Sequence, residues 1–224
     1  MSSSRARLFD SSVGTKILIG LTGLGLVLYL VAHIAGNLLV LLGPETFNEY
    51  SHVLLGNPLI PVIEVGLLLV LVVHMYKTAR MQLANRAARP VRYEQKKPAG
   101  GSSRKSLASS TMIFSGAWLL LFMIVHVATF KYGPVYEAAG GVRDLYRLEM
   151  ENFGNPLTVV FYVISMLVVG SHLWHGSSSA FQSTGLVHSR WTPRVLVAGK
   201  AFAVIVAGGF ALIAVWAFFT GGRP

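Results

Sequence analysis

Five long apolar stretches, separated by short polar segments, dominate the pattern of this chain. Each holds about 20 mainly apolar residues, the length that a helix needs to cross the hydrocarbon core of a bilayer. Pairs ending in proline, typical of helix boundaries, border four stretches: Gly43-Pro44, Asn57-Pro58, Asn155-Pro156 and Thr192-Pro193. The pattern predicts an all-α integral membrane bundle, a single domain over residues 1–224, with transmembrane helices over about 16–42, 58–80, 108–131, 156–178 and 193–220.

Composition supports the membrane as the solvent. Of the 224 residues, 53% are hydrophobic and only 12% are charged, and the mean hydropathy is +0.58, which is too apolar for an ordinary soluble domain. The chain has no cysteine, so it can neither form disulfides nor offer thiolates to a zinc or iron–sulfur site. A redox centre bound by this chain would therefore take histidine or methionine ligands.

The basic residues set the expected orientation. The formal net charge is +10, but these side chains lie between the apolar stretches, which favours membrane topology over nucleic-acid binding. The segment from Lys77 to Lys105 holds nine basic residues against one acid, and cytoplasmic flanks carry the excess of Lys and Arg. We therefore expect a basic cytoplasmic loop over about 81–107, a cytoplasmic N-terminus and an outside C-terminus, in a bacterial-type cytoplasmic membrane.

Each of the first four apolar stretches places one histidine deep within it: His33, His74, His126 and His172. An ionisable side chain at such a position is a functional hypothesis by default. At the rise of an α-helix, His33 and His126 lie roughly 25 Å along helices that run outward. His74 and His172 lie equally far along helices that run inward, so the four depths form an outer pair and an inner pair.

A bis-histidine haem b needs two imidazoles from opposing helices at one level, and helix bundles hold such cofactors in their cores. We therefore expect an outer haem b with iron ligands His33 and His126, and an inner haem b with iron ligands His74 and His172. A hydrogen-bonded packing role is the alternative for any single histidine. Zinc is disfavoured, because ligands at two levels cannot close a tetrahedral site.

Small and polar residues of the spans supply further candidates. A flat macrocycle needs close backbone approach, and seven small residues fit this need, although ordinary helix packing explains them too: Gly20, Gly23, Gly25, Gly66, Ser115, Gly116 and Gly170. The inner haem propionates could meet Tyr76, Lys77, Arg80 and Ser177, and the outer ones Lys131 and Tyr132. Positive-inside sorting explains Lys77 and Arg80 equally well.

A resemblance to a known family rests on the four histidines in order, on the Phe47-Asn48 to His52 segment, and on the block His172-Leu-Trp-His-Gly-Ser-Ser-Ser-Ala-Phe-Gln-Ser. Through all five spans the chain resembles the cytochrome b anchor of single-anchor, di-haem succinate dehydrogenases and fumarate reductases. The resemblance implies that the first histidine of the block, His172, is the ligand. His175 shares much of the same helix face and is an alternative ligand or a propionate contact.

The resemblance implies a subunit of succinate:quinone oxidoreductase. In such a complex a flavoprotein with FAD oxidises succinate and an iron–sulfur subunit relays the electrons. The anchor then passes them through the inner and outer haems b to quinone, usually menaquinone, so the succinate chemistry belongs to partner subunits. The basic loop and the segment after His172 would receive the iron–sulfur subunit, and the complex could form a higher oligomer.

Three residues are candidates for a quinone site. Glu64 is the one acid within a span, near the outer histidine level, where it could bind quinone, carry its proton, or simply be a protonated or hydrogen-bonded acid near the border. Asn37, one turn beyond His33, could serve the outer haem or quinone, or bond a neighbouring helix. His52, in a short outer loop, could touch quinone or have no function.

Other protein classes stay open as alternatives. A quinol-oxidising cytochrome b carries one ligand for each of its two haems on the same helix. No span here carries such a pair of ligands. The cytochrome b of a hydrogenase or of another quinone-linked dehydrogenase is a second redox alternative. A transporter whose histidines relay protons is the non-haem alternative.

Overall fold

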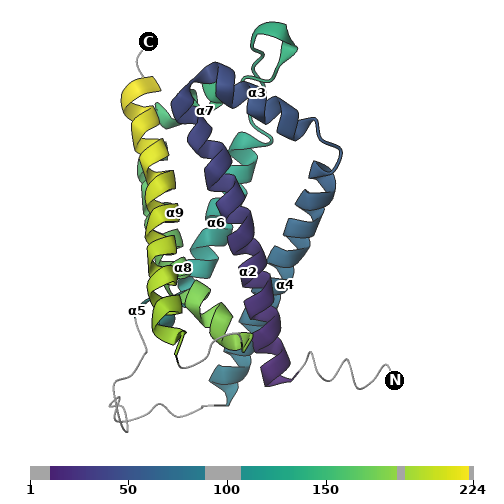
Figure 1. Cartoon of the computed structure of the whole chain (residues 1–224), viewed down its shortest axis with the longest axis vertical. Helices are drawn as coiled ribbons and strands as arrows, with labels where there is room; N and C mark the ends of the chain where they lie inside the picture. Colours follow the sequence, from purple (N-terminus) through teal and green to yellow (C-terminus); the bar gives the residue numbers. More distant parts are fainter. Residues whose placement is uncertain (1–10, 89–106, 186–189, 222–224) are drawn as a thin grey trace.

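The structure is a computed structural model that describes residues 11–88, 107–185 and 190–221, and these form a bundle of helices (Figure 1). Its elements are α2 (Ser12–Asn37), η1 (Leu38–Leu42), α3 (Pro44–Leu55), α4 (Ile60–Ala87), α5 (Leu107–Ser110), α6 (Met112–Phe130), η2 (Ala139–Gly141), α7 (Leu145–Phe153), α8 (Pro156–Ser183) and α9 (Thr192–Gly221). A lone bridge between Glu137 and Arg143 is the β-structure of the described residues. The predicted all-α class is confirmed.

Five of the described helices are long and apolar enough to cross a membrane: α2 with η1, α4, α6, α8 and α9. Their number agrees with the prediction, but several bounds differ. The helix α2 begins at Ser12 because the hydroxyl of Ser11 accepts a hydrogen bond from Gly14 N at 3.0 Å and caps it. The helix α4 continues to Ala87, since residues 81–87 lack glycine and proline, so the expected loop over 81–107 starts as helix. Residues 89–106 of that loop lie outside the described residues.

Two short helices, α3 and α7, lie at the end of the bundle where α9 also ends, which we call the α7 end (Figure 1). The first turn of α2 lies at the opposite end, called the Ser12 end. Both short helices were missed from the sequence, because neither is long enough to span a membrane. Asn48 joins them: its Nδ2 donates to Asp144 Oδ1 at 2.8 Å, and its Oδ1 accepts from Tyr146 N at 2.9 Å.

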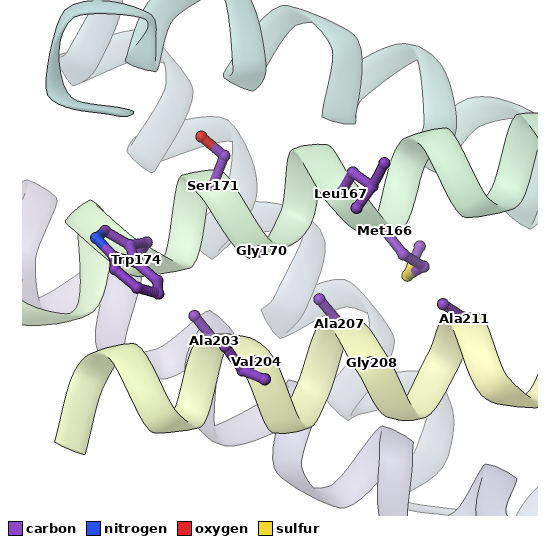
Figure 2. A pocket seen from close by; sticks show the side chains of 10 residues that line it. All are labelled: Met166, Leu167, Gly170, Ser171, Trp174, Ala203, Val204, Ala207, Gly208 and Ala211. Carbon is purple, nitrogen blue, oxygen red and sulfur yellow. The ribbon is translucent and has the colours of Figure 1, made fainter. Parts of the chain in front are cut away.

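The helices α8 and α9 share the most extensive contact of the bundle, and small residues allow it. A Cβ at Gly170 would lie 3.2 Å from Ala207 Cβ. Figure 2 shows a groove between these helices, with Met166 and Trp174 on α8 and Ala203 on α9, and its lining is almost wholly apolar. By contrast, none of the residues of α4 is buried by the rest of the chain. The groove contains none of the four histidines, so the candidate site lies elsewhere in the bundle.

Candidate functional site

The outer histidines meet between α2 and α6, toward the α7 end. The ring centroids of His33 and His126 lie 5.8 Å apart, with the ring planes at 90°. Imidazole nitrogens bind a metal such as zinc at about 2 Å, so two imidazoles on opposite sides of one metal ion have their ring centres roughly 6 Å apart. The observed spacing is close to that value, and it is also within the roughly 4.5–7 Å usual for packed aromatic rings.

Aromatic rings enclose the outer pair. Tyr29 stacks on His33 with the centroids 5.3 Å apart, and Phe210 of α9 lies 5.4 Å from the same ring. Phe122 and Phe130 flank the other imidazole at 5.5 and 5.2 Å. Such rings restrict the imidazoles by packing and keep water from them.

Hydrogen bonds hold the two outer imidazoles unequally. His126 Nδ1 lies 3.2 Å from the hydroxyl of Tyr162, on α8. His33 Nδ1 lies 3.4 Å from Asn37 Nδ2 and 3.5 Å from the Tyr29 hydroxyl, both at the long limit of hydrogen bonding. Stacking therefore restrains His33 more than hydrogen bonding does.

At the inner level, Thr22 of α2 restrains the imidazole of His74. The threonine hydroxyl has a single proton, which it donates to the backbone, to Leu18 O at 2.7 Å or Ile19 O at 3.1 Å. Thr22 Oγ1 also lies 3.1 Å from His74 Nδ1, and both contacts are hydrogen bonds when the hydroxyl donates to the backbone and Nδ1 donates to the hydroxyl. This arrangement favours a proton on Nδ1, which leaves the lone pair of Nε2 for a metal.

Ser115 of α6 does the same for His172 of α8. Its hydroxyl donates to Met112 O at 3.0 Å and accepts from His172 Nδ1, 2.9 Å away. Among the described residues, the hydrogen bonds of both inner histidines to side chains are made through Nδ1. Two inner imidazoles from different helices thus have the same kind of hydroxyl partner, which favours the same metal-binding tautomer in both.

Glycines bring the backbone close to both inner histidines. A Cβ at Gly23 would lie 3.3 Å from His74 Cε1, and one at Gly116 would lie 3.8 Å from His172 Cε1. These are two of the seven small residues singled out in the sequence. Gly66 faces open space and Gly170 packs against α9, so those two serve no histidine.

The inner imidazoles are farther apart than the outer ones. In the part of the chain that the structure describes, no ring contact joins His74 and His172, although the first lies within electrostatic range of the second. His175 is half-buried one turn further along α8, and its imidazole makes no hydrogen bond to any described residue. The geometry therefore favours His172 over His175 as the inner candidate on α8.

The expected propionate contacts separate into two groups. Tyr76 and Arg80 lie exposed on α4, with the guanidinium 5.7 Å from the tyrosine ring, and Lys77 lies on the same helix. Ser177 is different, because it is buried against Gly199 of α9 and donates its hydroxyl proton to Leu173 O at 2.7 Å. Nothing in this geometry supports a propionate contact for Ser177.

Glu64 forms an ion pair with Lys131, which joins α4 to the end of α6. Both side chains are about two-fifths exposed, and Tyr29 lies within electrostatic range of Glu64. The ion pair therefore lies beside the outer histidines, which agrees with the level predicted for Glu64 from the sequence. Lys131 Nζ also lies 5.9 Å from the ring centre of Tyr132, whose side chain is exposed.

Two other candidates need correction. Among the described residues, Asn37 makes its side-chain hydrogen bonds within its own helix, where its Nδ2 donates to His33 O at 2.8 Å, and not to a neighbouring helix. His52 does not lie in a loop, since it is in α3, where it is exposed beside a surface hollow formed with residues 138–144. Neither feature is readable from apolar periodicity alone.

The structure adds candidate site residues that the sequence did not single out. Thr22, Tyr29 and Tyr162 each contact an imidazole of the four, and all three are polar side chains inside apolar spans. That position is the signal that could have identified them, because a polar group in a span needs a partner.

Comparison of the chain with protein-family models, with curated proteins and with solved structures gave no match. The class that the fold defines is an all-α, multi-pass membrane protein with five helices able to span the bilayer. Within that class, the paired histidines are its most distinctive chemical feature.

Proposed function

We propose that this chain is the membrane anchor and electron-transfer subunit of a succinate:quinone oxidoreductase, with two haems b between an iron–sulfur partner and quinone, most simply menaquinone. The observation that carries the proposal is the state of the inner histidines. Hydroxyls that also bond the helix backbone lie 3.1 Å from Nδ1 of His74 and 2.9 Å from Nδ1 of His172, an arrangement that favours the Nδ1–H tautomer and leaves Nε2 to a metal. The family resemblance of the sequence supplies the rest of the assignment.

The donor set fits haem iron better than an isolated metal ion. Over the described residues, no group of three or more His, Asp or Glu side chains gathers as a ligand set. Zinc needs three or four protein ligands, whereas haem brings four of its own and needs two from the protein. When bound, haem b supplies a reversible one-electron iron couple.

In this proposal the four histidines hold the iron atoms at two levels, and the hydroxyls and rings around them set their orientation. Thr22 and Ser115 raise the basicity of the inner imidazoles by accepting the Nδ1 protons. Phe122, Phe130 and Phe210 exclude water from the outer pair. The order of the two sites along the bundle gives electrons a route from the Ser12 end to the α7 end.

Quinone would bind at the outer end of that route. Glu64 and Lys131 form their ion pair beside Tyr29, which stacks on His33. A carboxyl and an ammonium group at this border can exchange a proton with the quinone oxygens and hydrogen-bond to them. Glu64 is thus the proposed proton carrier, whose carboxylate takes up a proton from the aqueous phase and passes it to the reduced quinone, with Lys131 as the residue that positions it.

The orientation is part of the proposal, with the Ser12 end in the cytoplasm, where a flavoprotein with FAD and an iron–sulfur subunit would dock. Because the chain contains no cysteine, single cysteines can be labelled without background. Leu107→Cys is exposed at the Ser12 end and Tyr132→Cys is exposed near the α7 end. In intact cells, an impermeant thiol reagent should label Tyr132→Cys alone, and the reverse pattern would contradict the orientation.

The function is tested by tagging the chain, purifying it from its native membrane in mild detergent and adding succinate. The expected result is co-purification of a flavoprotein and an iron–sulfur protein, with haem b reduced by succinate. His172→Ala should retain both partners and lose the succinate-dependent reduction of haem. A nickel or molybdenum partner would instead indicate the hydrogenase or formate dehydrogenase class, and a colourless protein would indicate the transporter.

A further inference from the structure

The groove between α8 and α9 is a feature of the bundle that the proposed function does not use (Figure 2). Its volume is about 280 Å³, slightly below the roughly 300–1,000 Å³ of pockets that hold drug-sized molecules. Two of its lining residues expose large apolar side chains, Leu167 of α8 at 70% and Val204 of α9 at 62%. The groove therefore opens on a surface suited to lipid, and its size suits a single hydrocarbon chain.

Lys200 of α9 lies at the end of the groove that is nearer the Ser12 end. The α9 residues of the lining follow it at the three- and four-residue spacing of a single helix face: Ala203, Val204, Ala207, Gly208 and Ala211. Its Nζ lies 5.1 Å from the ring centre of Trp174, the last lining residue along α8. Past this point the helices close up, since a Cβ at Gly199 would lie 2.7 Å from Ser177 Oγ. The groove thus has one closed end, which carries a cation.

The position of Lys200 along α9 is that of a membrane border. From Ala201 to Gly221 the helix has no charged side chain and is about 20 residues long, the length that crosses the hydrocarbon core. Lys200 directly precedes this stretch, and tryptophans such as Trp174 are enriched at the same level. From Lys200 to Ala211 the groove runs roughly 16 Å along the helix, which is half of a hydrocarbon core of about 30 Å. The groove therefore covers the depth of one lipid leaflet.

The charge of Lys200 calls for an anion at that border. Neither α8 nor α9 contains Asp or Glu. Among the described residues, no ion pair joins Lys200 to a carboxylate. Basic side chains near the membrane surface attract anionic lipid headgroups. A lipid with a net negative charge therefore complements both parts of the site, the apolar groove and its cationic end.

From this arrangement we propose that the groove between α8 and α9 binds one anionic phospholipid, with an acyl chain between the helices and the headgroup phosphate at Lys200. The proposal does not depend on the haem assignment. A zwitterionic lipid offers the same chain without a net charge, so Lys200 should select the anionic headgroup. A helix of a second copy is disfavoured as the occupant, because the groove covers one leaflet and a spanning helix crosses both.

The headgroup is tested by native mass spectrometry of the full chain, purified in mild detergent with any subunits that it retains. Phosphatidylglycerol and phosphatidylcholine are the probe lipids, and one phosphatidylglycerol should stay bound where phosphatidylcholine is removed. Lys200→Gln deletes the charge and should lower phosphatidylglycerol retention about fivefold. The matched control is Arg194→Gln on the same helix, whose guanidinium lies 4.7 Å from the Trp191 ring and outside the groove lining, and it should retain the lipid.

The acyl chain is tested by filling the groove. Gly208 lines it, and a Cβ there would meet nothing within 4 Å, so Gly208→Leu should occupy the groove without moving the helices. Gly66→Leu on α4 is the matched control, because a Cβ at Gly66 also meets nothing within 4 Å. Retention of phosphatidylglycerol should fall to the level of phosphatidylcholine in Gly208→Leu and stay at the wild-type level in Gly66→Leu.

The place of the lipid is tested by cross-linking. A phosphatidylglycerol with a photoactivatable acyl chain should cross-link to residues 166–174 and 203–211, and these products should be absent in Gly208→Leu. Equal retention of the two lipids by the wild type would overturn the proposal, as would unchanged phosphatidylglycerol retention in Lys200→Gln or in Gly208→Leu. A dimer of the chain that Gly208→Leu dissociates would assign the groove to a second copy and would also overturn it.

Discussion

The outer and inner histidine pairs are prepared by different means. At the outer level, five aromatic rings pack against His33 and His126, and the two imidazoles lie 5.8 Å apart. At the inner level, hydroxyls hold His74 and His172 at 3.1 and 2.9 Å, and glycines bring the backbone close to both rings. Aromatic packing dominates around the outer pair, where Tyr162 adds one hydrogen-bond contact to His126 at 3.2 Å, whereas each inner histidine has a hydroxyl partner.

The comparison shows that histidines of a single bundle can lie in two different environments. Aromatic rings exclude water but do not select the tautomer of an imidazole. A hydroxyl whose own proton is donated to the backbone favours one tautomer and raises the basicity of the ligand. Solvent access and hydrogen bonding both tune a metal centre. Two haems held in these sites should therefore differ in midpoint potential, although all four ligands are histidine.

The largest expected effect is the loss of a whole site. His126→Ala or His33→Ala should remove the outer haem and leave the inner one, because each iron needs both of its protein ligands. A pyridine haemochrome assay should show the haem content per chain falling by half.

The matched control for these replacements is His52→Ala, because His52 is exposed on α3 and is not one of the four proposed haem ligands. It should retain both haems. Loss of both haems in His33→Ala, with folding intact by circular dichroism, would contradict independent sites.

The inner pair can be broken through its glycine. In Gly23→Val, a Cβ 3.3 Å from His74 Cε1 and the methyl groups beyond it should displace the imidazole, so the inner haem should be lost. Gly25→Val changes the same helix two residues away, where a Cβ meets only Val70 at 3.8 Å. Absorption spectra should show one haem in Gly23→Val and two in Gly25→Val, and equal losses would mean that α2 itself is disturbed.

Removing hydroxyls sharpens the comparison between the pairs. Ser115→Ala and Thr22→Val delete the acceptors of the inner Nδ1 protons, and loss of such a partner costs roughly 10–100-fold in metal affinity. Tyr162→Phe deletes a longer bond, within an aromatic enclosure that stays in place, so its effect should be about tenfold or less. Haem retention during dilution and washing measures both, and a larger loss in Tyr162→Phe would reverse the comparison.

The smallest effect concerns stability at the α7 end. Burial raises the pKa of Glu149 from 4.5 to about 8, so the folded state binds this proton more tightly than the unfolded state. That contribution to stability is full below about pH 4.5 and is lost as pH rises toward 8. The Tm of the wild type should therefore fall by a few degrees relative to Glu149→Gln between about pH 5 and 8. Glu151→Gln should follow the wild type, and parallel curves for Glu149→Gln and wild type would contradict the burial of this acid.

The five spans and the shared level of His33 and His126 were easier to predict from the sequence than the helices α3 and α7 at the α7 end. Apolar stretches report lipid-facing helices directly, and counting residues along them placed His33 and His126 at one level, where their rings meet. The helices α3 and α7 escaped notice because their stability comes from tertiary packing and from Asn48, which bonds residues nearly 100 positions away. The hydroxyl partners of the inner histidines were not predicted from the sequence for a similar reason. Ser115 was noted only for its small size, and a contact between α6 and α8 cannot be read from either helix alone.

The central claim is that four histidines bind two haems b, and the most direct test is a haem count. The chain is purified in mild detergent, its dithionite-reduced absorption spectrum is recorded, and pyridine haemochrome is measured per chain. The account predicts two haems b, one lost with His126→Ala and the other with His172→Ala. A protein without haem, or one that keeps both haems in these two variants, would contradict it.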